Sequence, residues 1–144
     1  LTMRRGSVRI GTVPDAVQVG PKVCLINKYS ASDGDLFPWG FRALGLGKLI
    51  GTRTWGGIVG ISGSLPYMDG TDIRVPFFTS FDPKTGNWII ENQGVDPDIL
   101  IDNDPVKEWN GEDQQLDRAI QEVMKELQNR KPLPGVPTPR DFSK

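Results

Sequence analysis

The first candidate for chemistry is a serine at the junction between an apolar run and an amphipathic segment. Ser32 follows the apolar residues 23–26 and precedes residues 36–46. This order predicts a strand, a tight turn and a helix, whose N-terminus presents free N–H groups and a partial positive charge. A nucleophile needs an exposed hydroxyl, N–H groups that stabilise an oxyanion, and a base. The turn would expose the Ser32 hydroxyl, and the Asp33 amide would supply part of the oxyanion hole.

No residue of the chain is a convincing base for that serine. The sequence contains no histidine, which excludes a self-contained Ser-His-Asp triad and any histidine-based metal site. Lys28 and Lys48 lie in strand contexts that do not predict a buried amine of lowered pKa. Glu91, at the end of an apolar run, is either a surface residue or a group that orients a distant partner. Ser-Asp-Gly is also a common turn sequence, so Ser32 keeps a purely structural alternative.

Composition excludes several classes of function. The 144 residues carry a formal net charge of -1, with 37% hydrophobic and 24% charged residues, as in an ordinary globular domain. That charge gives no electrostatic case for nucleic acid or an anionic membrane, and no apolar run reaches the roughly 20 residues of a membrane helix. The single cysteine, Cys24, forms no internal disulfide and is expected to be a buried, inert thiol. Residues 1–11 lack the apolar region of a signal peptide.

The elements that would position Ser32 form an α/β pattern. Residues 22–27 and 48–51 read as short buried strands on either side of a helix, whose apolar stripe would be Phe37, Phe41 and Leu44. A strand, a helix and a strand at this spacing predict a parallel βαβ unit.

The second half of the chain predicts an antiparallel region and a long helix. Strands are expected at residues 71–78, 88–91 and 99–101, the first two joined by a hairpin loop at 82–87. Residues 113–129 predict a helix that packs on the sheet through an apolar stripe of Leu116, Ile120, Val123, Met124 and Leu127. Three parts are expected: loop-rich residues 1–21 with a short strand near 8–13, residues 22–129 as the catalytic portion, and residues 130–144 as a proline-rich extended tail.

Three motifs in order carry a resemblance to a known family. They are residues 29–35 (YSASDGD), 46–57 (LGKLIGTRTWGG) and 91–98 (ENQGVDPD). Together they resemble the catalytic domain of tricorn-type proteases, a branch of the C-terminal-processing (tail-specific) serine peptidases, over roughly residues 20–129. The resemblance implies an α/β fold with a βαβ-containing mixed sheet, covering helices and an antiparallel hairpin region, layered as in crotonase and Clp protease.

The resemblance also implies roles for individual residues. Ser32 matches the nucleophile, Asp33 the residue whose amide helps form the oxyanion hole, and Glu91 the glutamate of the tricorn-type tetrad. Gly56 and Gly57 belong to the loop expected to line the substrate. Most C-terminal-processing peptidases use a Ser-Lys dyad, and the lysine position here is Gly57. This departure favours the tricorn branch, where a histidine and a second serine come from an upstream segment.

The function implied is a serine endopeptidase that cleaves oligopeptides through an acyl-enzyme at Ser32, with no metal or cofactor. Because its base would lie outside this chain, we expect little or no turnover from the chain alone. The expected partners are a peptide substrate and further copies of the chain, with no nucleic acid and no membrane, and the expected location is cytoplasmic. Two alternatives stay open: a non-catalytic α/β interaction or assembly module, and a crotonase-type acyl-CoA enzyme. The second would need a basic cluster for CoA, and none lies near the proposed pocket.

Overall fold

The computed structural model of the chain describes residues 2–3, 10–11, 13–14, 17–63 and 66–132. Its elements in chain order are β1 Thr2–Met3, β2 Ile10–Gly11, β3 Val23–Ile26, α1 Asp33–Ala43, β4 Lys48–Gly51, β5 Gly60–Ser62, β6 Val75–Phe78, β7 Ile99–Leu100, α2 Pro105–Trp109 and α3 Gln114–Gln128. Among these helices, none is long and apolar enough to span a bilayer. Most of the expected proline-rich tail, residues 133–144, lies outside the described part.

A three-stranded parallel sheet forms the centre of the fold. Its strand order is β3-β4-β7, with Val23 opposite Lys48 and Ile50 opposite Ile99. Leu49 and Ile50 in the central strand have no exposed surface. Burial on both faces is what a parallel sheet requires, because its crossover helices cover it. The predicted parallel βαβ unit is therefore confirmed.

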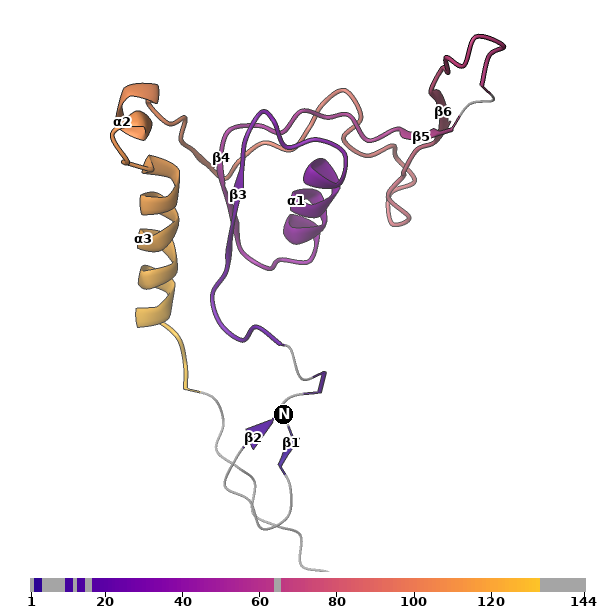
Figure 1. Cartoon of the computed structure of the whole chain (residues 1–144). Helices are drawn as coiled ribbons and strands as arrows, with labels where there is room; N and C mark the ends of the chain where they lie inside the picture. The colour runs from indigo at the N-terminus through magenta and orange to yellow at the C-terminus, as the bar shows by residue number, and fades with distance from the viewer. Residues whose placement is uncertain (1, 4–9, 12, 15–16, 64–65, 133–144) are drawn as a thin grey trace, which may run out of the picture.

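Helices α1 and α3 lie on opposite sides of β3 and β4, as Figure 1 shows, and each contacts both strands. The buried apolar cluster consists of Ile26, Phe41, Leu49 and Val95. It joins α1 to the sheet and to the loop that precedes β7. The layered α/β architecture expected from the sequence is confirmed.

Helix α1 begins earlier and buries a different stripe from the one predicted. It starts at Asp33 and buries Asp35, Pro38 and Phe41, whereas Phe37 and Leu44 are 64% and 74% exposed. Both stripes contain Phe41, and a period of 3.6 residues permits either. An aspartate is not expected in a buried stripe, but hydrogen bonds to its carboxylate make that burial possible.

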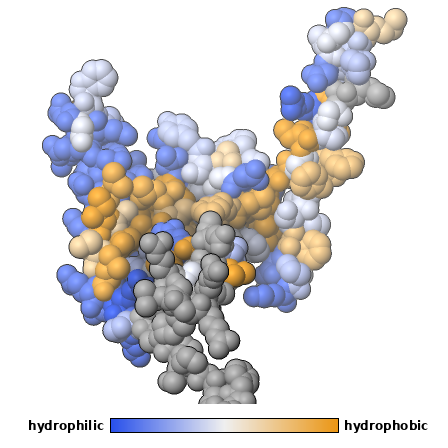
Figure 2. All heavy atoms as spheres, turned by 60° about the horizontal axis from the view of Figure 1, so that its bottom comes forward, coloured by the Kyte–Doolittle hydropathy of each residue, from blue (hydrophilic) through white to orange (hydrophobic). Residues whose placement is uncertain are grey.

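Helix α3 is confirmed, with Asp113 as N-cap accepting a hydrogen bond from Leu116 N at 3.0 Å. The predicted packing face is wrong in part, because Ala119 and Glu122 are buried and Val123 is half-buried. The rest of the apolar stripe is between 42% and 53% exposed: Leu116, Ile120, Met124 and Leu127. Figure 2 shows apolar surface on the side of the molecule where α3 lies. The small Ala119 lets the helix approach the sheet, and two cations compensate the buried charge of Glu122.

The expected antiparallel hairpin region is confirmed, but the pairing predicted between residues 71–78 and 88–91 is wrong. Strand β6 pairs antiparallel with β5 instead. The loop around residues 82–87 is closed by a bridge between Phe81 and Trp88 and by a hydrogen bond from Asp82 N to Asn87 O at 2.9 Å. Residues 88–91 are not a strand, because Ile90 has φ 27° and the chain turns there. The β5–β6 pair extends away from the sheet as an arm (Figure 1).

Two short elements complete the described chain. The strand expected near residues 8–13 corresponds to β2, which pairs antiparallel with β1, although residues 8, 9 and 12 lie outside the described part. Helix α2 was not predicted. Asp104 caps it by accepting hydrogen bonds from Val106 N and Lys107 N, and a proline occupies its first turn, where no N–H is needed.

Candidate active site

A compact turn connects β3 to the serine. Asn27 O accepts a hydrogen bond from Ser30 N at 2.9 Å, and Asn27 N donates to Ser30 Oγ at 3.1 Å. The Asn27 side chain also accepts from Tyr29 N at 2.9 Å. Such local side-chain bonds are the reason why asparagine and serine favour turns. They end the strand and reverse the chain within four residues of sequence.

Ser32 is the N-cap of α1 and has an unusual backbone conformation. Its φ is 57° and its ψ is -113°, while its carbonyl accepts from Asp35 N at 2.9 Å and from Leu36 N at 3.0 Å. Backbone strain of this kind in a non-glycine residue costs on the order of 1–3 kcal/mol and concentrates at functional sites. The side chain is exposed and makes no capping hydrogen bond, so the hydroxyl is free of described partners. The predicted exposure of this hydroxyl at a strand-to-helix turn is confirmed.

The Asp33 N–H has no hydrogen-bond acceptor in the part of the chain that the structure describes. The next amide, Gly34 N, is occupied by Ala31 O at 2.8 Å. An unpaired N–H directly after an exposed hydroxyl, at the positive end of an eleven-residue helix, is an arrangement that stabilises an oxyanion.

The loop after β4 passes beside the serine. Gly56 N donates to Asp35 Oδ1 at 2.7 Å and Gly57 N to Asp35 Oδ2 at 3.1 Å. Gly57 O accepts from Ser32 N at 3.2 Å, and Gly56 O from Asn92 N at 2.7 Å. The polar backbone groups of both glycines are therefore used within the chain. Gly56 is buried and Gly57 is half-buried, and their role in lining the substrate stays a prediction.

Gly56 is required by the close approach of two backbone segments. Its φ is +86°, and a Cβ at this position would lie 2.5 Å from Gly94 N. Since that neighbour is backbone, no side-chain movement would relieve the clash. The tight approach holds residues 56–57 against residues 92–94.

Glu91 reaches the same loop from the turn that replaces the predicted return strand. Its Oε2 accepts from Ile58 N at 2.7 Å and from Val59 N at 3.1 Å. The carboxylate is half-buried, and no described residue donates to its Oε1. The structure thus joins Ser32 and Glu91 to opposite ends of residues 57–59, and it leaves one carboxylate oxygen free for a further partner.

Two residues of this site carry no role in the sequence prediction. Asp35 is fully buried, and the signal for it was its position three residues after a serine, which is the spacing of a capping box. Thr54 is buried as well, and its Oγ1 accepts from Val95 N at 2.8 Å while its own N–H donates to Val95 O at 3.1 Å. No local pattern marks Thr54, because its partner lies 41 residues away.

Within the described part of the chain, Lys48, Lys28 and Cys24 make contacts that do not involve Ser32. Lys48 Nζ lies 2.5 Å from Glu122 Oε2, and this hydrogen bond raises the pKa of the amine. Lys28 Nζ lies over the ring of Tyr29, 5.4 Å from its centroid. Cys24 is half-buried rather than fully buried, and burial raises the pKa of its thiol. A raised thiol pKa lowers the thiolate fraction, as expected for an inert cysteine.

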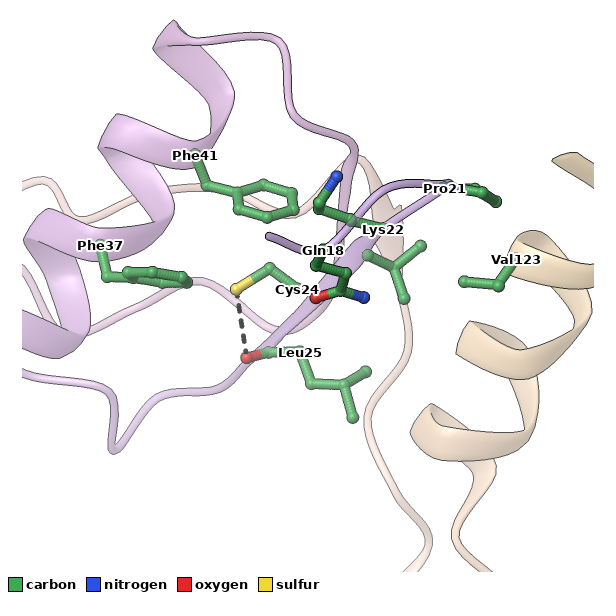
Figure 3. A pocket seen from close by; sticks show the side chains of 9 residues that line it. Gln18, Pro21, Lys22, Cys24, Leu25, Phe37, Phe41 and Val123 are labelled. Atoms are coloured by element: carbon green, nitrogen blue, oxygen red, sulfur yellow. Dashed lines mark hydrogen bonds between the residues drawn. The ribbon is translucent and has the colours of Figure 1, made fainter. Parts of the chain in front are cut away.

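A cavity of about 480 Å³ lies beside β3, but it is not part of this site. Figure 3 shows Phe37 and Phe41 of α1 on one side of it and Val123 of α3 on the other. The remaining lining residues are Gln18, Pro21, Lys22, Val23, Cys24 and Leu25. None of the predicted site residues lines it, so this cavity is not the substrate cleft beside Ser32.

Comparison with known sequences identifies relatives over most of the chain. The model of peptidase family S41 matches residues 5–101. The chain is 43% identical over 126 residues to the tricorn protease of Thermoplasma acidophilum, covering 88% of this chain and 12% of that protein. It is 46% identical over 112 residues to the tricorn protease of Thermoplasma volcanium, covering 78% of this chain and 11% of that protein. The chain therefore spans only about an eighth of the length of these curated relatives.

Comparison with solved structures agrees with the sequence matches. A crystal structure of the tricorn protease superposes with a TM-score of 0.70 at 45% identity, covering 76% of this chain and 11% of that one. A crystal structure described as a peptidase from Parabacteroides merdae superposes with a TM-score of 0.57 at 24% identity, covering 72% of this chain and 32% of that one. The second likeness concerns the fold alone.

Proposed function

Because the chain belongs to peptidase family S41, we propose that it supplies the nucleophile-bearing part of a tricorn-like serine peptidase that hydrolyses oligopeptides. Ser32 is the proposed nucleophile, the Asp33 amide an oxyanion donor and Glu91 the carboxylate that orients the base. Gly56 and Gly57 are proposed to border the substrate. The observation that carries the proposal is the Ser32 turn, where an exposed hydroxyl on a strained backbone lies next to an N–H that has no acceptor among the described residues.

The proposed reaction is acyl transfer to water through Ser32. Oγ attacks the peptide carbonyl and its proton passes to a base, while the Asp33 N–H stabilises the negative oxygen of the tetrahedral intermediate. Collapse expels the amine, which takes up the proton, and water then attacks the ester with help from the same base. The base is proposed to be a histidine outside this chain, since the 144 residues contain none. The proposed acceptor of an imidazole N–H is Oε1 of Glu91, which has no donor among the described residues, while Oε2 binds the amides of Ile58 and Val59.

We further propose that the complete enzyme is a cytoplasmic homo-oligomer. Exposed large apolar side chains support the assembly, because their burial against another copy would be favourable. Met68, in the segment that joins β5 to β6, is fully exposed, and Phe77 on β6 is 76% exposed. Trp109 at the end of α2 is 90% exposed.

Labelling with a fluorophosphonate tests the proposal. In the complete, base-containing enzyme, the probe should attach to Ser32, and Ser32→Ala should abolish both labelling and peptide cleavage. Ser62→Ala, which removes a hydroxyl from β5, should leave both unchanged. Labelling is located by mass spectrometry of the digested protein.

The alternatives predict different results. A non-catalytic assembly module would show no labelling of Ser32 and no difference between the wild type and Ser32→Ala. A crotonase-type enzyme would bind CoA and would leave peptides intact. Rapid peptide cleavage by the 144-residue chain alone would show that a base other than the proposed histidine exists within it.

A further inference from the structure

We infer that Asp35 is a positioning residue for the Ser32 nucleophile, a role that rests on the proposed function. Its carboxylate holds the loop whose carbonyl in turn fixes the Ser32 backbone. Asp35 does not face the substrate, because its side chain has no exposed surface. It would act through Gly57 rather than on the reacting atoms.

Asp35 is a buried carboxylate with no cation among its described contacts. Its two oxygens instead accept the amides of two successive residues, Gly56 and Gly57, at 2.7 and 3.1 Å. A buried carboxylate is tolerated only where such bonds replace its water. Both donors belong to the loop beside Ser32, so the hydrogen bonds of the buried carboxylate hold that loop in place.

Three hydrogen bonds close a ring through the nucleophile. Ser32 N donates to Gly57 O at 3.2 Å, Gly57 N to Asp35 Oδ2 at 3.1 Å, and Asp35 N to Ser32 O at 2.9 Å. In an ordinary capping box the carboxylate at this position bonds the N-cap amide directly. Here the peptide groups of Gly57 are inserted between the two residues, so the helix cap also fixes the loop.

This ring supplies a reason for the unusual conformation of Ser32. A non-glycine residue keeps a strained φ only where its surroundings over-determine it. Both polar backbone groups of Ser32 are held, the N–H by Gly57 and the carbonyl by the first turn of α1. In this conformation the adjacent Asp33 N–H has no acceptor in the described part of the chain, and Ser32 stays exposed.

The Asp35→Asn substitution tests the inference because it keeps the shape of the side chain. An amide offers one acceptor oxygen and places an NH₂ donor against the second loop amide, so one hydrogen bond is lost. Asp98→Asn is the matched control. Asp98 also accepts a backbone amide, Leu49 N at 2.7 Å, and it pairs with Arg42 in the last turn of α1, at the opposite end of that helix from Ser32.

Amide hydrogen exchange of the full chain gives a readout that does not depend on activity. We expect the Ser32 and Gly57 amides to exchange about tenfold faster in Asp35→Asn, the factor that corresponds to one ordinary hydrogen bond. Asp98→Asn should leave both rates unchanged. A Ser32 exchange rate that is the same in the two variants would overturn the inference.

Kinetics of the complete enzyme separate positioning from simple structural support. Asp35→Asn should lower kcat by about 10²-fold with little change in KM, because a displaced nucleophile loses transition-state geometry rather than substrate binding. An unchanged kcat would also overturn the inference. If the wild-type enzyme cleaves no peptide through Ser32, the proposed function fails, and the exchange rates alone then decide whether Asp35 holds the turn.

Discussion

At the scale of residues, the site consists of one exposed hydroxyl and two carboxylates that bind backbone amides. Asp35 and Glu91 each accept two loop N–H groups, and hydrogen bonds to a charged acceptor contribute roughly 1.5–3 kcal/mol apiece. The two bonds to Asp35 hold residues 56–57 against the first turn of α1, and the two bonds to Glu91 hold residues 58–59 against the turn that contains Glu91. The two carboxylates differ in exposure. Asp35 is fully buried, whereas Glu91 is half-buried and its Oε1 has no described hydrogen-bond donor.

Replacement of Glu91 by glutamine tests whether that free oxygen matters. The amide can still accept a loop N–H but carries no charge to stabilise an imidazolium, so kcat of the complete enzyme should fall by about 10²-fold or more. KM should change little. Glu112→Gln, on an exposed carboxylate before α3, is the control and should behave as the wild type. An unchanged kcat in Glu91→Gln would mean that Glu91 only binds the loop amides and does not orient the base.

At the scale of elements, α3 shows how far a periodic pattern determines packing. The pattern predicts the helix correctly but places its apolar stripe against the sheet, whereas Ala119 and Glu122 are the residues buried there. The helix is held partly by polar contacts that hydrophobic periodicity does not encode. Gln115 Nε2 donates to Ile101 O at 3.0 Å, and Lys48 pairs with Glu122.

A pair of adjacent glutamate substitutions distinguishes the two faces of α3. Ala119 is 4% exposed, so Ala119→Glu would bury an unpaired charge and should destabilise the chain by about 3 kcal/mol or more. Ile120 is 52% exposed, and Ile120→Glu should change the free energy of unfolding by no more than about 0.5 kcal/mol. Denaturant unfolding of the chain measures both values. A larger loss of stability in Ile120→Glu than in Ala119→Glu would mean that the apolar stripe of α3 packs on the sheet.

At the scale of the whole molecule, the described chain has a small core and a large exposed apolar surface. Its buried apolar cluster contains four residues, while Phe77, Phe78, Phe81 and Trp88 are all more than half exposed. Ionic contacts therefore matter for holding the layers together. The pair between Lys48 on β4 and Glu122 on α3 joins the sheet to the helix that covers it.

This ion pair predicts a loss of stability in acid. The hydrogen bond from Lys48 lowers the pKa of Glu122 below its usual value of 4.5, with Arg118 adding to the effect. A lowered pKa in the folded state means that the stabilisation is present above about pH 5 and is lost as the pH falls through the folded-state pKa. Tm should therefore drop between about pH 5 and pH 3. Glu122→Gln should lower Tm at pH 7, and its Tm should fall less than that of the wild type between pH 5 and pH 3. If Tm falls equally in both proteins, other carboxylates cause the loss of stability in acid.

The amino-acid sequence by itself determined the parallel βαβ unit, the position of Ser32 at its turn, and the extent of α3. These features follow from local hydrophobic period and turn chemistry, which act over a few residues. The three motifs also indicated the family correctly. The roles assigned to Ser32, Asp33, Gly56, Gly57 and Glu91 stay predictions.

Only the tertiary structure decided which polar groups meet. Asp35 bonds amides 21 and 22 residues away, and Glu91 bonds amides 32 and 33 residues away, so neither partnership leaves a local trace. The same reason explains the errors. Residues 88–91, predicted as a strand, form a turn from which Glu91 binds the loop amides. Asp35, near the start of α1, is buried and binds amides of the same loop. Period and propensity fix local conformation, but satisfaction of buried hydrogen bonds is settled only when distant segments pack together.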